Sequence, residues 1–126
     1  MANDQIFPTV TQNFLNKVRT CPNDEVFHSK VGTEWKAQTW KQFYEEVCKI
    51  STGLMEIGMS PGDKACILSN TRLEWTQTDM AILGTLGVTV PIYASNTDED
   101  CTYIINHCEA KFIFCEDFKQ LEKILR

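Results

Sequence analysis

The chain has 126 residues, which is enough for one domain or for part of a larger one. Its hydrophobic fraction of 43% can supply a core, and its charged fraction of 23% is ordinary for a globular protein. The net charge of -5, with no offsetting cluster of Lys or Arg, argues against nucleic acid as a main partner, because phosphate binding requires a basic surface.

The six cysteines and the apolar segments indicate a cytoplasmic protein. No C-x-x-C pair is present, and the first ten residues lack the basic start and apolar run of a signal peptide. We therefore expect reduced thiols, with Cys66 and Cys115 buried in strands. The longest apolar stretch, 80–93, is shorter than the roughly twenty residues of a membrane span, so any membrane contact would be peripheral, at the inner face.

The first predicted element is a helix in an N-terminal arm, residues 1–38. Thr9 and Gln12 have the spacing of a capping box, in which side chains satisfy the free backbone groups of the first helical turn. The helix should end before Pro22, because proline disfavours helical geometry in the preceding residue. Its apolar face is predicted to hold Val10, Phe14, Leu15 and Val18.

A short hairpin is predicted next. Residues 25–30 and 34–38 have the composition of strands, and Gly32 lies between them near the expected turn. Because the two segments are separated by only three residues, they are expected to pair as antiparallel neighbours.

The strongest helical pattern begins after Thr39, with Gln42 at the reciprocal position of a capping box. Gly58 is the predicted stop, and residues 60–63 form a turn. The predicted inner face repeats at a period near 3.6 and comprises Trp40, Phe43, Tyr44, Val47, Ser51, Leu54 and Ile57.

Strands and helices then alternate. Residues 64–69 form a strand with a continuous apolar centre, as expected when both of its faces are covered. Thr71 and Glu74 predict a capped helix over about 71–86, and residues 88–93 predict a second strand.

The alternation continues to the end of the chain. Residues 97–100 open a helix with three carboxylates in its first turn, which favours the positive end of the helix dipole. Residues 111–115 are a third strand, and Asp117 caps a last helix carrying Phe118, Leu121, Ile124 and Leu125. The predicted inner face of the preceding helix comprises Cys101, Ile104, Ile105 and Cys108.

Strands that alternate with helices imply parallel pairing through right-handed crossovers. The predicted fold class is therefore α/β, a partial three-layer, Rossmann-like parallel sheet preceded by the N-terminal helix and hairpin. Residues 39–126 are expected to hold the βα repeats. The last helix ends without a Gly or Pro stop, so we expect an incomplete domain, although a natural C-terminus would look the same.

No strong catalytic or metal-binding motif is present. Both common glycine-rich phosphate loops are absent, and Gly84 and Gly87 are predicted to lie on a helix that packs closely against the sheet. The two histidines, His28 and His107, have no partners at zinc-ligand spacing. We therefore predict no catalytic residue and no metal site.

Arg72 is the one cation that stands at a plausible ligand position. It follows the carboxyl end of a predicted parallel strand, where ligands of open α/β sheets bind, and it opens a helix, whose N-terminus attracts phosphates. Asn70 and Thr71 lie beside it and are the other weak candidates for cofactor binding. The alternative is that Asn70 and Thr71 only cap the helix while Arg72 is solvated or pairs with an acid.

Four phrases, in order, resemble segments of the acyl-adenylate-forming enzymes, and in particular of their long-chain fatty acyl-CoA synthetase branch. They are QTWKQFYEEV at 38–47, GDKACILSNTRLEW at 62–75, AILGTLGVTVPIY at 81–93 and YIINHCEAKFIFCED at 103–117. The second resembles the family's G-D-x-V-A-I-L-S-x-N-R-x-E-W segment, with Thr71 interrupting the usual Asn-Arg pair.

The resemblance implies a ligase that activates a long-chain fatty acid with ATP and Mg2+ to an acyl-adenylate and transfers the acyl group to coenzyme A. The family's phosphate loop, ribose-binding acid and catalytic lysine do not map onto residues 1–126. The expectation is therefore an inactive N-terminal fragment of the large AMP-binding domain, with no cofactor bound.

Two alternative functions place the chain in other classes of protein. A stand-alone interaction or binding module could use the same α/β layers without catalysis, and it would self-associate to cover apolar surface. A receiver-like or nucleotide-binding α/β domain would need paired acids at the end of the first strand or a glycine loop, and neither is present.

Overall fold

The computed structural model describes residues 8–125. The chain divides into two compact units, Met1–Glu46 and Val47–Arg126, and the boundary falls within helix α2, Trp40–Glu56. The sequence predicts a division after residue 38, at the start of that helix. Of the first ten residues, on which the prediction of no signal peptide rests, 1–7 lie outside the described residues.

The first unit begins with α1, Val10–Thr20, which stops before Pro22 as predicted. The hydroxyl of Thr9 accepts a hydrogen bond from the Gln12 backbone at 3.0 Å, which confirms the predicted cap. Of the predicted apolar face only Phe14 is fully buried, and it belongs to a cluster of aromatic rings. Its ring lies within 6.2 Å of those of Trp40, Phe43 and Tyr44.

The predicted hairpin is also present. Strands β1, Glu25–Val31, and β2, Glu34–Thr39, pair in antiparallel fashion, and Gly32 takes the positive φ of 65° that the tight turn requires. Phe27 stacks on Phe43 at 4.8 Å, which anchors the base of the hairpin. Toward the tip, Trp35 is 68% exposed.

Helix α2 starts and ends as its sequence predicts. Thr39 and Gln42 exchange both bonds of the capping box, at 2.9 and 3.2 Å. At the other end, Gly58 has a φ of 103° and Met59 donates to the Leu54 carbonyl at 2.9 Å, a Schellman-type stop. Ile57, predicted on the inner face, lies beyond the helix end and is 66% exposed, because the chain turns away there.

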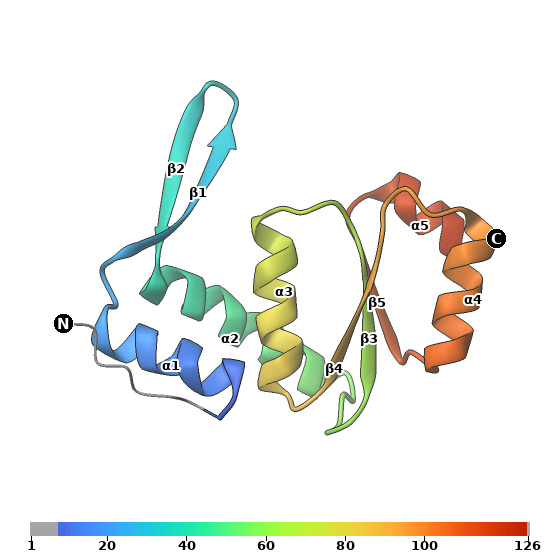
Figure 1. The fold of residues 1–126 in the computed structure, drawn as a ribbon, viewed down its shortest axis with the longest axis horizontal. Helices are drawn as coiled ribbons and strands as arrows, with labels where there is room; N and C mark the ends of the chain where they lie inside the picture. Colours follow the sequence, from blue (N-terminus) through green and yellow to red (C-terminus); the bar gives the residue numbers. More distant parts are fainter. Residues whose placement is uncertain (1–7, 126) are drawn as a thin grey trace. The chain divides into compact units, whose positions relative to one another are not determined.

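The second unit contains the predicted parallel sheet (Figure 1). Its order is β4–β3–β5, with β3 at Lys64–Leu68, β4 at Val88–Ile92 and β5 at Phe112–Cys115, all parallel. Helix α3 lies against one face of the sheet, and helices α4 and α5 lie against the other. The central strand β3 is buried on both sides, as its continuous apolar sequence predicts.

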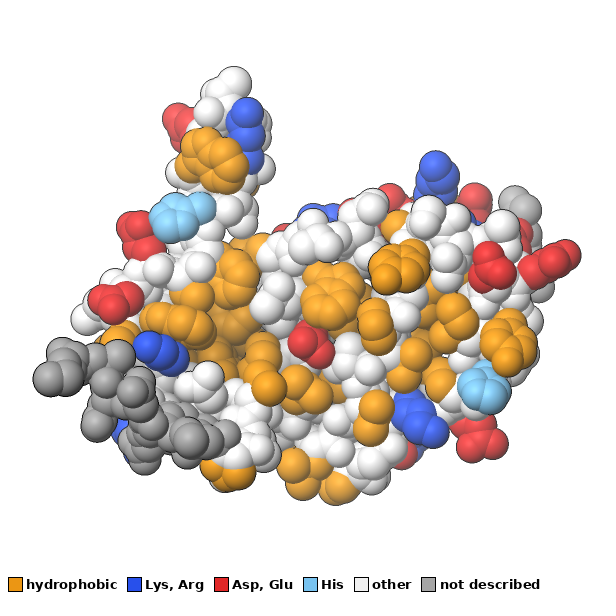
Figure 2. Space-filling model, viewed as in Figure 1, with side chains coloured by type: hydrophobic (Ala, Val, Ile, Leu, Met, Phe, Trp, Pro, Cys, Tyr) orange, Lys and Arg blue, Asp and Glu red, His pale blue; other side chains and the backbone are white. Residues whose placement is uncertain are grey.

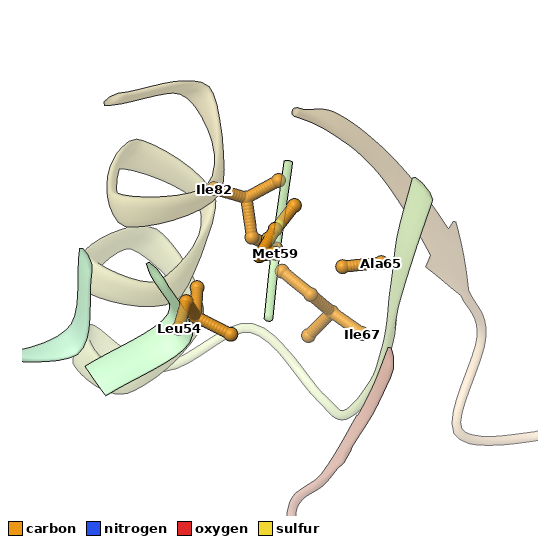
Figure 3. Close-up of a cluster of buried hydrophobic side chains, with 5 residues drawn as sticks. All are labelled: Leu54, Met59, Ala65, Ile67 and Ile82. Carbon is orange, nitrogen blue, oxygen red and sulfur yellow. The ribbon is translucent and has the colours of Figure 1, made fainter. Parts of the chain in front are cut away.

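Side chains of β3 alternate between two cores. On the face toward α2 and α3, five side chains point toward one another (Figure 3). These are Leu54, Met59, Ala65, Ile67 and Ile82. On the opposite face, Cys66 and Leu68 pack with Ile92 and with Cys101 of α4.

Helix α3, Leu73–Gly84, corrects two predictions. Its N-cap is Arg72 with no side-chain bond, so Thr71 does not cap it. The cause is that Asn70 is held toward β5 by hydrogen bonds to Glu116, which delays the start of the helix. Gly87, predicted on the helix, lies beyond its end.

The last two helices begin as predicted. In α4, Asp98–Cys108, Thr97 and Asp100 form a complete capping box. In α5, Phe118–Leu125, the carboxylate of Asp117 accepts the Gln120 backbone N–H at 2.9 Å. Of the four apolar residues that the sequence places on α5, Phe118 and Leu125 are 71% and 72% exposed, because they lie at the two ends of this two-turn helix.

Candidate functional site

The candidate site lies at the carboxyl ends of β3 and β5. The helix that follows β3 covers one face of the sheet, and the helix that follows β5 covers the other. Such a divergence creates a crevice in which ligands of open α/β sheets bind. A pocket of about 180 Å³ opens there. It is lined by Ile67, Ser69, Arg72, Glu74, Trp75, Thr78, Phe114, Cys115 and Glu116.

Glu116 is the residue that joins the two loops. Its Oε2 accepts hydrogen bonds from both the backbone N and the side-chain Nδ2 of Asn70, each at 3.1 Å. Its own backbone N–H donates to the Leu68 carbonyl, also at 3.1 Å. The side chain of Glu116 is only 14% exposed, so these bonds form partly out of water. The loop after β3 is therefore fastened to the end of β5.

Arg72 is shared between two carboxylates. Its Nε donates to Glu74 Oε2 at 2.8 Å, and its Nη1 lies 3.6 Å from Glu116 Oε1. The hydrogen bond to Glu74 and the nearby negative charge raise the pKa of Arg72, and the same bond lowers the pKa of Glu74. The guanidinium is thus held by protein acids while remaining 45% exposed.

This arrangement does not fit a phosphate group. One positive charge faces two negative ones, so the local net charge is negative and would repel a nucleotide phosphate. The structure brings two of the predicted residues, Asn70 and Arg72, to Glu116, whereas Thr71 is exposed and does not line the pocket. Their contact with a cofactor stays a prediction.

Sequence reasoning missed Glu116 and the aromatic wall formed by Trp75. A signal for Glu116 was present: the rule that places ligands at the carboxyl ends of parallel strands applies to β5 as much as to β3. Glu116 is the first residue after β5, in the position that Ser69 holds after β3.

The histidines have structural partners. His28 Nε2 lies 2.9 Å from Glu25 Oε2 on the hairpin, and His107 stacks on Tyr103 with ring centroids 5.5 Å apart. Within residues 8–125, no group of three or more His, Cys, Asp or Glu side chains could hold a metal ion. Over the same residues, no helix has the length and apolar character needed to cross a bilayer.

Basic side chains are scattered on the face shown in Figure 2. Blue side chains lie singly there, among red and orange ones, and none of them forms a stripe.

Comparison with solved structures identifies the same fold. A fatty acyl-adenylate ligase from L. pneumophila, solved with acyl adenylate and pyrophosphate, superposes with a TM-score of 0.78 at 17% identity, over 90% of this chain and 20% of that one. The N-terminal subdomain of Klebsiella oxytoca NpsA gives 0.75 at 15% identity, over 86% of this chain and 28% of that one.

Sequence comparison gives the family. The chain is 34% identical over 119 residues to the long-chain-fatty-acid–CoA ligase ACSBG2 of Xenopus laevis, covering 94% of this chain and 16% of the relative. It is 30% identical over 117 residues to the human ACSBG2 ligase, covering 93% of this chain and 18% of the relative. It thus spans about a sixth of these relatives. Since residues 14–126 match the family of AMP-binding enzymes, the chain belongs to that family.

Proposed function

We propose that these residues form the N-terminal part of the large domain of a long-chain-fatty-acid–CoA ligase. The complete enzyme would convert a fatty acid and ATP, with Mg2+, to an acyl-adenylate and pyrophosphate, and it would then transfer the acyl group to coenzyme A and release AMP. The observation that carries the proposal is the similarity to long-chain-fatty-acid–CoA ligases over 94% of this chain. The observed fold, with β4–β3–β5 as one parallel sheet, supports it.

In this proposal the 126 residues supply scaffold and no catalytic group. Arg72, the strongest cationic candidate at the crevice, is already paired with Glu74 and Glu116. The remaining length of the relatives, of which this chain covers 16%, would provide the phosphate and acyl sites. The loop held by Glu116 would then set the position of the first strand and helix of the sheet.

The experiment compares two polypeptides. The 126-residue chain should catalyse no fatty-acid-dependent exchange between ATP and pyrophosphate, whereas a polypeptide continuing through the length of the relatives should form acyl-CoA. Exchange by the short chain would overturn the scaffold role. Failure of the long polypeptide with fatty acids of every length tested, while it remains folded, would overturn the ligase assignment.

We further propose that the short chain self-associates in solution. An apolar groove of about 400 Å³ lies between α2 and β5, lined in part by Ile50, Ile57 and Phe112. Beside it, β5 is an edge strand of the described sheet, and exposed edges and apolar patches promote association. Ile57→Asp should lower the mass measured by light scattering. Met55→Asp, in the last turn of α2 and outside the residues that line the groove, should not.

The spacing of the cysteines, which favours reduced thiols, supports a cytoplasmic location, with any membrane contact made at the surface. Flotation of the complete polypeptide with vesicles would measure that contact. Recovery of the polypeptide only in the aqueous fraction would contradict it.

A further inference from the structure

Four of the six cysteines gather in one core layer, between the sheet and helices α4 and α5. Cys66 on β3 and Cys101 on α4 are fully buried, and Cys108 and Cys115 pack against them. All four are free thiols. Of these four cysteines, Cys115 lines the crevice at Arg72, and the other three do not.

Within this layer, Cys66 and Cys108 touch. Their Sγ atoms are 3.8 Å apart, although the two residues are separated by 42 positions in the sequence. Cys108 Sγ also donates to the Ile105 carbonyl at 3.6 Å. Either thiol could donate to the other sulfur. The two sulfurs are therefore direct neighbours in the core.

The two thiols differ in access and in mobility. Cys66 is completely buried in the central strand, and burial together with the Cys108 contact raises the pKa of its thiol to about 12. Cys108 is only partly buried and is the last residue of α4, followed by Glu109 in a left-handed conformation. The end of a helix shifts at less cost than its middle, so Cys108 can both meet a small oxidant and move toward Cys66.

We propose that Cys66 and Cys108 are an oxidisable pair that closes to a disulfide when a hydroperoxide reaches Cys108. The contact of 3.8 Å needs to shorten to a bond of about 2 Å, which a shift of the last turn of α4 provides. The bond would fasten α4 to the central strand β3. It is independent of the ligase proposal, because it concerns only thiols within this chain.

One hydroperoxide molecule oxidises one pair of thiols, Cys66 and Cys108. The Cys108 sulfur, deprotonated as it reacts, attacks one peroxide oxygen; the O–O bond breaks, Cys108 becomes a sulfenic acid, and the leaving hydroxide takes the proton to give water. The Cys66 sulfur then attacks the Cys108 sulfur. The S–O bond breaks, and the departing hydroxide takes the Cys66 proton to give a second water. Two thiols thus lose two electrons to one hydroperoxide.

The test is a disulfide map of the 126-residue chain after treatment with hydrogen peroxide and alkylation of the remaining thiols. Trypsin followed by chymotrypsin separates the cysteines, since cleavage after Lys64, Arg72, Tyr103 and Lys111 puts Cys66, Cys101, Cys108 and Cys115 on different fragments. The expected product joins the fragments of Cys66 and Cys108, lacks two hydrogen atoms relative to their sum and is reversed by dithiothreitol.

Three variants sharpen the result. Cys108→Ser should abolish the linked fragment, and Cys115→Ser, in the same layer, should leave it unchanged. Cys66→Ser, or Cys66→Ala if the serine variant loses its far-UV circular dichroism, should leave a sulfenic acid on Cys108 that a dimedone probe labels. Two results in the wild-type chain would overturn the proposal: Cys66 remaining alkylatable after peroxide, or an equal yield of links to Cys101 or Cys115.

Discussion

The two ends of the parallel sheet are closed by different means. At the amino end, Lys111 Nζ donates to the Gly58 carbonyl at 2.6 Å and lies 3.2 Å from the Asp63 carboxylate. Gly87 sits there with no room for a side chain, since a Cβ would collide with Met59 Cε and lie 3.1 Å from two carbonyl oxygens. This end is closed by packing and short polar links.

At the carboxyl end, space remains. Glu116 fastens the loop after β3 through Asn70 and Arg72, but a pocket of about 180 Å³ opens beside these bonds. The two ends of the sheet therefore have different roles. The amino end holds the strands together, and the carboxyl end keeps a polar, adjustable opening, as expected of sheets that place ligands there.

The largest expected effect is at the packed end. Gly87→Ala should destabilise the fold by about 1–3 kcal/mol, because the new methyl group overpacks a site bounded by backbone oxygens. Chemical denaturation measures the loss. The matched control is Gly53→Ala, on helix α2 with no atom within 4 Å of the added Cβ, which should stabilise by about 0.5–1 kcal/mol. Equal effects at the two glycines would contradict the contrast in packing.

At the open end, Glu116→Ala should cost about 1 kcal/mol, because both Asn70 donors lose their acceptor but can turn to water. Hydrogen exchange of the Asn70 backbone amide should accelerate by more than the loss of global stability alone would cause. Glu122→Ala on the exposed side of α5 removes the same charge and should stay within about 0.5 kcal/mol of the wild type. Unchanged exchange at Asn70 would mean that Glu116 does not hold the loop.

Acid should weaken the link at the amino end of the sheet. The hydrogen bond from the Ser60 backbone and the Lys111 contact lower the pKa of Asp63 below its ordinary value of 3.8. A lowered pKa means that the folded state favours the carboxylate, so this stabilisation is complete above the ordinary value and is lost as pH falls through the lowered one. The free energies of unfolding of the wild type and of Asp63→Asn, measured by chemical denaturation across that pH range, should converge in acid. A difference that stays constant with pH would refute the contribution of the Asp63 carboxylate.

The smallest effect belongs to Arg72. Arg72→Met removes an ion pair that is largely exposed, so stability should fall by less than about 1 kcal/mol, and the loss should shrink in high salt. In the complete polypeptide, nucleotide affinity should stay near that of the wild type if the guanidinium serves only Glu74 and Glu116. A tenfold weaker affinity for ATP would instead assign Arg72 to the cofactor.

Much of the fold could be predicted because its signals are local. The capping box at Thr39, the helix start at 97–100 and the stop at Gly58 depend on residues close in the sequence, and all three are observed. The start of α3 was predicted wrongly at Thr71 because a contact with Glu116, 46 positions away, outweighed the local capping pattern. A local pattern cannot register such a partner.

The sequence by itself determined the alternation of strands and helices, the parallel sheet and the family, because apolar periodicity, caps and short phrases are written along the chain. Only the tertiary structure decided that Arg72 is neutralised by Glu74 and Glu116, that Gly87 has no room for a methyl group, and that Cys66 meets Cys108. The physical reason is distance along the chain. Charge pairing, steric exclusion and sulfur contact depend on which distant segments the packed cores bring together.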